Sequence, residues 1–481
     1  MSGAGEIYLR STMAWCEPCG KTEFARIVAR PQGVFMERMC PAHGAKSVKI
    51  ARDPAWYVER TAQPRNMVSH ADCQPAKAGC PLDCGLCQWH TGGFYLPVFS
   101  ITNDCNLDCP ICFTYNRPDL KYHKSVEDTR RIIRHVVEKS GGVQLINLTG
   151  GEPTLHPDLF AILDACRHEA IGRITMNTNG IRIAGDRRFA EKLKAAGVQV
   201  VLSLDTLNPE KSIAIHGKDI VKAKLKCLET LEALDIPTTI LSVCIKGHNE
   251  ADVADIVHTC FRKPFVRSVT VQNMTFTGQY GSHFEPREHI TMDEVEALLA
   301  EREGIARGDF FAPSAYHPLC YSAAYYIVRD GRLISLSTLL ERGLLAEMSA
   351  GSYLLNPARD ISAQFRDGIN RLWADGADEE TIAILRRFLA ELYPTHGQPS
   401  AQERQQILER WVKMLLIHPH MDADNFDIDR VSACGDLVPD ESGRLIPACA
   451  YNLLYRQKDP RFWVEPEKRP RPPPVFYAKA A

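Results

Sequence analysis

Cysteine is the residue that most constrains how this chain can fold. Seventeen of its 481 residues are cysteine, and ten of them lie between Cys16 and Cys112. A chain of this length that is 45% hydrophobic can bury a core without a disulfide framework. The first residues, MSGAGEIYLRSTMAW, lack the pattern of a signal peptide, so we expect a cytoplasmic protein. In a reducing cytosol, clustered cysteines indicate metal ligation.

Charge and hydropathy exclude several classes of partner. Lys and Arg number 57 and Asp and Glu number 59, which gives a net charge of −2. This balance gives no reason to expect nucleic acid or an anionic membrane surface as a partner. No apolar run approaches the roughly 18–20 residues of a membrane-spanning helix, so we expect no transmembrane segment. Peripheral membrane association is expected only if the substrate is a lipid.

Strand-like and helical segments alternate through the middle of the chain, which predicts a parallel sheet with right-handed crossovers. Six strands would form a partial (β/α)6 barrel, an α/β fold. The expected strands are Val98–Thr102, Val143–Leu148, Ile174–Asn177, Val198–Leu204, Thr238–Ile245 and Ser268–Asn273. The expected helices cover about 126–139, 157–168, 187–196, 219–234 and 250–260, and Ser125-Val-Glu-Asp128 predicts a capping box before the first.

The pattern changes on both sides of this barrel. Before it, Phe24–Arg30 and Val34–Met39 predict a hairpin. After it we expect a mixed α+β region with hairpins in Ala324–Ser337 and Asp436–Tyr451, and helices near 361–373, 378–392 and 402–417. The domains we expect are a metal-ribbon and iron–sulfur region at 1–95, the barrel at 96–290, a C-terminal auxiliary-cluster and substrate domain at 291–465, and a Pro-rich tail at 466–481.

Three cysteines follow the first barrel strand directly. Cys105, Cys109 and Cys112 have the spacing C-x3-C-x2-C, which can hold three irons of a [4Fe–4S] cluster. Such a cluster normally takes four cysteines, so three leave one iron open to a small molecule. The loop lies at the carboxyl end of a strand, where βα barrels build their active sites. The alternatives are a structural zinc site or a cluster with a distant fourth ligand.

The same spacing occurs earlier, in Cys80, Cys84 and Cys87, without a preceding strand. We therefore expect an auxiliary cluster there, with a zinc site as the alternative. The candidates for its fourth ligand are scattered cysteines, which could also supply part of a second auxiliary cluster or be buried thiols: Cys73, Cys320, Cys434 and Cys449. We expect Cys166, Cys227, Cys244 and Cys260 to be core residues.

Two further pairs of ligands flank the N-terminal hairpin. Cys16-x2-Cys19 and Cys40-x2-His43 are separated by about 20 residues, which is typical of a zinc-ribbon or rubredoxin-type site. The spacing does not distinguish zinc from a single iron, although a histidine ligand favours zinc. A closed site of four protein ligands predicts a structural role.

Polar groups follow successive barrel strands. The second strand ends in Thr149-Gly150-Gly151-Glu152-Pro153, where we expect the glycines to let a ligand approach the backbone and Glu152 to face an ammonium group. The third strand ends in Asn177 and Asn179, and the fourth in Ser203 and Asp205. Together these groups predict a binding rim at one end of the barrel.

With these motifs, residues 96–280 resemble the radical S-adenosylmethionine (SAM) superfamily. The resemblance implies that Cys105, Cys109 and Cys112 hold the cluster and that SAM chelates its open iron and is split by one electron to a 5′-deoxyadenosyl radical. Gly150, Gly151 and Glu152 would face the methionine end of SAM. Candidates for its carboxylate, ribose and adenine are Asn177, Asn179, Ser203, Asp205 and Asn273. A one-electron reductant such as flavodoxin or ferredoxin is implied as partner.

Outside the barrel, the ribbon and the segments GCPLDCGLC, HPLCYS, HPHMDADNFDIDRVSAC and GRLIPACAYNLLYR resemble the class D radical SAM methylases. This subgroup includes tetraether lipid synthases and a pterin methyltransferase. The resemblance implies carbon–carbon bond formation at an unactivated carbon, with one or two auxiliary [4Fe–4S] clusters near the substrate. The reaction would couple lipid chains or transfer a methyl group, in the second case with a folate-type carbon donor.

The substrate stays open at this point. A lipid needs a long apolar tunnel with a basic rim, whereas a pterin needs a flat pocket with carboxylate and amide groups. Two other hypotheses are a radical SAM peptide maturase and a non-catalytic, zinc-stabilised binding protein.

Overall fold

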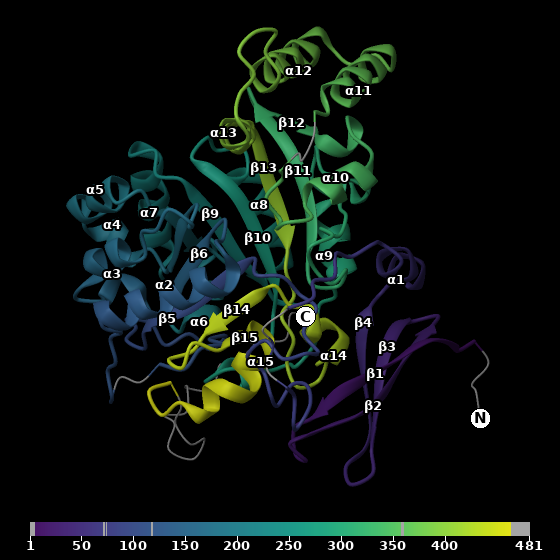
Figure 1. The fold of residues 1–481 in the computed structure, drawn as a ribbon, viewed down its shortest axis with the longest axis vertical. Helices are drawn as coiled ribbons and strands as arrows, with labels where there is room; N and C mark the ends of the chain where they lie inside the picture. Colours follow the sequence, from purple (N-terminus) through teal and green to yellow (C-terminus); the bar gives the residue numbers. More distant parts are fainter. Residues whose placement is uncertain (1–4, 71–72, 74, 117–118, 357–359, 463–481) are drawn as a thin grey trace.

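The computed structural model describes residues 5–70, 73, 75–116, 119–356 and 360–462. Two sheets organise this part of the chain: a small antiparallel sheet near the N-terminus and a curved sheet of eleven strands (Figure 1). The expected tail at 466–481 lies outside the described residues. Within them, none of the helices is both long enough and apolar enough to cross a bilayer.

The N-terminal sheet confirms the predicted hairpin and adds a strand on each side of it. Its strands pair antiparallel in chain order, and alternate side chains pack inward against Tyr57 of the following helix. The elements are β1 (Ile7–Cys16), β2 (Lys21–Arg30), β3 (Gly33–Cys40), β4 (Gly44–Ala51) and α1 (Pro54–Thr61). The two turns of this sheet that carry cysteine lie at the same end, because β1 and β3 run in the same direction.

Six parallel strands in chain order form the predicted partial barrel. They are β5 (Leu96–Thr102), β6 (Ile146–Gly150), β7 (Ile174–Thr178), β8 (Gln199–Ser203), β9 (Thr238–Cys244) and β10 (Val266–Asn273). The second strand begins at Ile146, three residues later than expected. Their aliphatic side chains, with the buried Cys166, Cys227, Cys244 and Cys260, form the largest core of the protein, which confirms the core role expected for these four cysteines.

Helices cover the outer face of these strands (Figure 1). Ser125 caps the first helix by accepting a hydrogen bond from the Asp128 N–H at 3.0 Å, as the sequence predicts. The helices are α2 (Val126–Ser140), α3 (Leu159–Ala165), α4 (Ile181–Gly185), α5 (Arg187–Ala195), α6 (Pro209–His216), α7 (Val221–Ala233) and α8 (Glu250–Cys260).

C-terminal strands extend the barrel sheet at both edges. Next to β10 lie β13 (Val412–Ile417), parallel to it, and then the predicted hairpin of β11 (Ser322–Arg329) and β12 (Arg332–Ser335). Next to β5 lies the second predicted hairpin, β14 (Asp436–Pro439) and β15 (Leu445–Pro447). These strands continue the barrel sheet, so the sheet itself marks no boundary between the barrel and a C-terminal domain. The expected domain boundary at residue 290 therefore stays a proposal.

One predicted element is wrong. The helix expected over 402–417 ends at Trp411, and residues 412–417 form β13. The segment VKMLLI is almost continuously buried, and a short apolar run of this kind does not distinguish a buried strand from a helix by periodicity. Its pairing with β10 decides the outcome.

The remaining helices follow β10 in the chain, and those between residues 342 and 411 form a lobe with a second core near the amino ends of the barrel strands, where Arg173, just before β7, pairs with Glu409. They are α9 (Met292–Leu299), α10 (Arg342–Met348), α11 (Ser362–Ala374), α12 (Glu379–Leu392), α13 (Ala401–Trp411), α14 (Ile428–Ser432) and α15 (Ala448–Ala450). Short 3-10 helices are η1 (Pro153–Leu155), η2 (Gly281–His283), η3 (Arg307–Asp309), η4 (Leu336–Thr338) and η6 (Arg456–Lys458), and η5 (Tyr451–Tyr455) is a π-helical turn.

A buried ion pair joins the N-terminal region to the barrel. The guanidinium of Arg60 on α1 contacts the carboxylate of Glu296 on α9, and both side chains are 2% exposed. Trp56 donates a hydrogen bond to the same carboxylate at 2.7 Å.

We expect Glu296→Ala to lower the free energy of unfolding by about 3–5 kcal/mol, because it leaves the Arg60 charge buried without its carboxylate. Urea denaturation followed by circular dichroism measures this loss. Glu301→Ala, at an exposed position just after α9, is the control and should change the midpoint little. An equal midpoint for both variants would contradict the assigned role.

Candidate functional site

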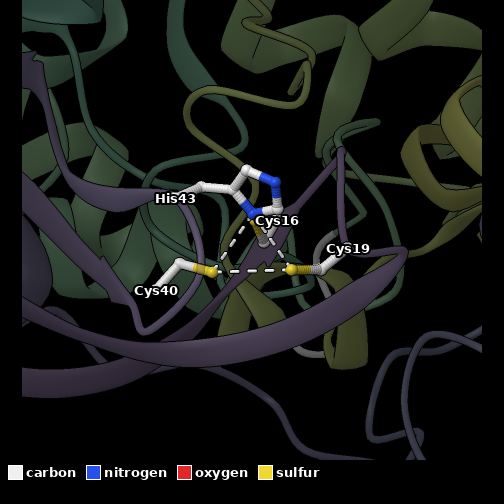
Figure 2. A group of neighbouring side chains, drawn as sticks. All are labelled: Cys16, Cys19, Cys40 and His43. Carbon is white, nitrogen blue, oxygen red and sulfur yellow. Dashed lines mark hydrogen bonds between the residues drawn. The ribbon is translucent and has the colours of Figure 1, made fainter.

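The N-terminal sheet brings the four predicted ribbon ligands together. Cys16 ends β1, Cys40 ends β3, and the following turns supply Cys19 and His43 (Figure 2). The Nδ1 atom of His43 lies 3.8, 3.2 and 3.5 Å from the sulfurs of Cys16, Cys19 and Cys40. All four ligand atoms lie within 4.8 Å of one another.

These separations suit one tetrahedral ion. Bond lengths of about 2.3 Å to sulfur and about 2.0 Å to nitrogen place neighbouring ligand atoms roughly 3.5–3.8 Å apart. Three thiols and one imidazole form a ligand set of the Cys3His type found in structural zinc sites. The residues therefore fit a zinc ion that fastens the two turns.

The three thiols after β5 lie on one loop at the carboxyl end of the barrel strands. Burial raises the pKa of the Cys105 thiol to about 12 and raises the pKa of Cys109 and Cys112 as well. The Cys112 thiol raises the pKa of Cys105 further, and Cys112 and Cys105 both raise that of Cys109. Buried thiolates need cationic iron to compensate their charge, so this donor set suits an iron–sulfur cluster.

Several polar groups surround these sulfurs. The Leu107 N–H donates to the Cys105 sulfur at 3.4 Å, and the Thr114 hydroxyl lies 3.2 Å from the Cys112 sulfur. The Nδ1 atom of His216 lies 3.9 Å from the Cys109 sulfur. Hydrogen bonds to cluster sulfurs adjust the reduction potential of iron–sulfur centres, so the loop can tune such a cluster.

The glycines at the end of β6 allow a close approach of two main chains, whereas the sequence predicts the approach of a ligand to the backbone. A Cβ atom on Gly150 would lie 2.2 Å from the Thr102 carbonyl oxygen, and one on Gly151 would lie 2.3 Å from that of Asp104. The Gly151 and Glu152 N–H groups donate to these same oxygens at 2.9 and 2.7 Å. The glycines therefore let the end of β6 contact the main chain that leads into the cysteine loop.

Glu152 ties the end of β6 to the end of β7. Its side chain is 1% exposed and accepts four hydrogen bonds, two from Thr154, one from the Thr178 hydroxyl and one from the Asn179 N–H. Three of these bonds go to Oε1 and one to Oε2. The contact of Glu152 with an ammonium group stays a prediction.

The other predicted rim residues lie at the carboxyl ends of β7, β8 and β10. The amide of Asn179 donates to the Asn106 side chain in the cysteine loop at 2.7 Å, while Asn177 faces Asn147 at 2.9 Å. Burial raises the pKa of Asp205 to about 6, although the Val243 N–H donates to it at 2.6 Å. Asn273 is buried, and its side-chain oxygen has no hydrogen-bond partner among the described residues.

Sequence reasoning missed two buried residues of this rim. Lys224 donates to the carbonyl oxygens of Asn179 and Ser203 at 2.8 and 2.5 Å and to the Ser203 hydroxyl at 3.0 Å. His216 lies between Cys109 and Asp205, 3.5 Å from the latter, and burial lowers the pKa of this imidazole to about 3. Neither residue belongs to a spaced motif, so nothing in the sequence marked them.

A cavity of about 150 Å³ lies inside the barrel beside the cysteine loop. Phe113 and Thr114, which follow Cys112, form part of its wall. Polar side chains from the barrel strands and from the C-terminal region also line it: Ser100, Asn147, Thr149, Thr175, Asn177, Gln199, Thr239, Ser268, Thr270, Gln272, His418, His420, Asp436, Asn452 and Arg456.

The remaining predicted metal ligands form two groups. Cys80, Cys84 and Cys87 form the first group. The nearby Cys80 and burial raise the pKa of Cys84, and burial and Cys80 raise the pKa of Cys87. Burial also raises the pKa of Cys320, Cys434 and Cys449, which are close enough to affect one another. Cys84 and Cys449 belong to one apolar cluster, whereas Cys73 is partly exposed.

The fold and these sites define an α/β barrel enzyme with a separate metal ribbon. Residues 99–260 match the family description "Radical SAM superfamily", and residues 8–52 match "HMPTM N-terminal zinc ribbon domain". The chain belongs to the radical SAM superfamily. Membership implies a [4Fe–4S] cluster and SAM as cofactors.

Similar proteins include one that aligns over nearly the full length. The 7,8-dihydro-6-hydroxymethylpterin dimethyltransferase of Methanocaldococcus jannaschii is 24% identical, over 93% of this chain and 94% of its own. A probable GTP 3′,8-cyclase of Pyrococcus abyssi is 31% identical, over 44% of this chain and 70% of its own. The crystal structure of Streptococcus suis SuiB bound to S-adenosylmethionine has a TM-score of 0.31 and 24% identity, covering 38% of this chain and 41% of that one.

We expect Cys19→Ser to remove one metal ion per chain from the ribbon, because it takes away one of four ligands that share a single ion. Elemental analysis of the purified protein measures the loss and distinguishes zinc from iron. Cys260→Ala, in the barrel core, is the control and should keep the ion. An unchanged zinc and iron content in Cys19→Ser would show that these four residues do not bind a metal.

Proposed function

We propose that this radical SAM enzyme forms a carbon–carbon bond at an unactivated carbon by methylating a compact substrate inside the barrel. The observation that carries the proposal is the small cavity beside the Cys105–Cys112 loop, whose mostly apolar wall carries several polar side chains. The full-length alignment with a relative named as a pterin dimethyltransferase supports methyl transfer.

In this proposal Cys105, Cys109 and Cys112 hold the cluster. With SAM bound, the cluster supplies a one-electron cleavage that gives a 5′-deoxyadenosyl radical able to activate an unreactive C–H bond. A one-electron reductant such as flavodoxin or ferredoxin is the proposed partner, and a folate-type molecule is the proposed carbon donor.

The chain's own residues hold the rim in place. Glu152 and Lys224 each join the carboxyl ends of two neighbouring strands, and Asn179 joins one of these ends to the cysteine loop. Rigid support of this kind keeps reacting groups at a fixed separation, which lowers the entropic part of the barrier. Tyr353 and Leu354, together with Asp436 and Val438 of the β14–β15 hairpin, complete the wall of the cavity.

The cavity, at about 150 Å³, is too small for a long hydrocarbon chain, and its mostly apolar wall with a few polar groups suits a compact heterocycle. A lipid-coupling enzyme needs an apolar tunnel, whereas a pterin-like substrate needs carboxylate and amide groups that fix its orientation. Asp436, Asn147, Gln272 and Asn452 provide such groups here. We therefore propose methylation of a small polar molecule rather than coupling of lipid chains.

We propose auxiliary [4Fe–4S] clusters at the two remaining cysteine groups. Cys80, Cys84 and Cys87 would hold one, with Cys449 as its fourth ligand because that thiol lies in the same apolar cluster. Cys320 and Cys434 are the candidates for a second. Their thiols are buried, so they need metal cations to stabilise them as thiolates.

Cys109→Ala tests the assignment of the cysteine loop. We expect it to abolish formation of 5′-deoxyadenosine, a loss of at least a hundredfold, while an iron–sulfur signal from the auxiliary groups persists in electron paramagnetic resonance spectra. Cys166→Ala, a core thiol, is the control and should keep cleavage near the wild-type rate. Continued cleavage of SAM by Cys109→Ala would refute the assignment.

Cys84→Ala tests the auxiliary site separately. We expect this variant to cleave SAM at a rate near that of the wild type, because Cys84 lies outside the cysteine loop at the barrel rim, but to lose methylated product. Product is measured by mass spectrometry with SAM and candidate pterins. A wild-type yield of product would remove any catalytic role for that site.

A further inference from the structure

One buried cation in the reaction cavity is not used by anything described so far. Arg456 is 5% exposed and borders the cavity. Its Nη2 atom donates to the Asn452 side-chain oxygen at 2.7 Å, and its guanidinium lies 5.2 Å from the centre of the Tyr451 ring. The Nε and Nη1 atoms are buried without a hydrogen-bond partner among the described residues.

No ion pair compensates this charge within the described part of the chain. Asp436 borders the same cavity, but its carboxylate accepts from the Tyr321 hydroxyl at 2.6 Å and lies 3.4 Å from the Nε2 atom of His418. A buried guanidinium without a carboxylate is costly for the folded state. Residues that reduce stability in this way are typical of functional sites.

Arg456 lies in the wall of the cavity that is next to the cysteine loop. It lines the same cavity as Phe113 and Thr114, which directly follow Cys112. Arg456 directly follows the π-helical turn η5 (Tyr451–Tyr455). Turns of this kind are rare and occur frequently at functional sites.

The segment that carries Arg456 separates it from the machinery shared by the family. The superfamily match covers residues 99–260, and SAM and the cluster are common to that family. Arg456 lies almost 200 residues beyond this match, at the β5 edge of the barrel next to β14 and β15. Arg456 ends the segment GRLIPACAYNLLYR, which resembles one subgroup of the family and not the superfamily as a whole, so its partner should be the substrate rather than the shared cofactor.

We propose that Arg456 binds an anionic group of the substrate, a carboxylate or a phosphate, beside the cysteine loop. This inference rests on the proposed function, because it takes this cavity as the substrate site. A guanidinium presents parallel N–H donors that match either anion in a bidentate pair. The two free nitrogens of Arg456, Nε and Nη1, are available for this contact.

The test measures stabilisation of the reconstituted, full-length holoenzyme by inorganic phosphate and, in a second arm, by glutarate. A ligand that binds only the folded state raises the thermal midpoint. We expect at least one probe to raise the midpoint of the wild type, and Arg456→Met to weaken the apparent affinity for that probe at least tenfold. Arg444→Gln, a partly exposed arginine on the β14–β15 hairpin, is the matched control and should respond like the wild type.

One further measurement separates a binding role from a structural one. Without any probe, Arg456→Met should be at least as stable as the wild type, because a hydrophobic residue replaces an uncompensated buried charge. The arm that shows stabilisation identifies phosphate or carboxylate as the anion.

Three outcomes would overturn the inference. One is that neither probe stabilises the wild type, and another is that Arg456→Met keeps the full response. The third is a tenfold loss of SAM affinity in Arg456→Met with unchanged affinity for the probes, which would assign the residue to the cofactor. If the wild type itself forms no 5′-deoxyadenosine, that result refutes the proposed function instead.

Discussion

The site depends on one close contact between main chains. At the end of β6, Gly150 and Gly151 lie so near Thr102 and Asp104 that no side chain fits between them. Hydrogen bonds from the Gly151 and Glu152 N–H groups then fix the start of the cysteine loop. The links made by Glu152 to β7 and by Asn179 back to Asn106 build on this contact.

Local spacing was sufficient to predict the ribbon site and most of the barrel. Cys16, Cys19, Cys40 and His43 meet as expected because two tight turns bring each pair together and a hairpin aligns the turns. The Cys105–Cys112 motif was found at the end of a strand because thiols so close in sequence have few other arrangements. Alternation of β-branched runs with amphipathic helices predicted β5 to β10 for the same reason, since each crossover is local.

Contacts between distant segments could not be read from the sequence. The strand β13 was mistaken for the end of a helix because its burial comes from a partner, β10, far along the chain. Lys224 and His216 carry no motif, and Arg456, which ends the segment GRLIPACAYNLLYR, becomes notable only through what surrounds it. Glu152 was identified from its motif, but its four donors, which come from the next strand end as well as its own, could not be read from the sequence.

The pairing of β10 with β13 also affects how the protein is made. Met414 lies 146 residues after its partner Ser268, and the helical lobe is inserted between them. During synthesis β10 is complete while β13, the strand that pairs with it, is still untranslated. The peptide N–H and C=O groups along this edge of β10 then have no strand partner. Closing such a long loop is slow. Nascent chains of this enzyme should therefore rely on chaperones until β13 has left the ribosome and paired with β10.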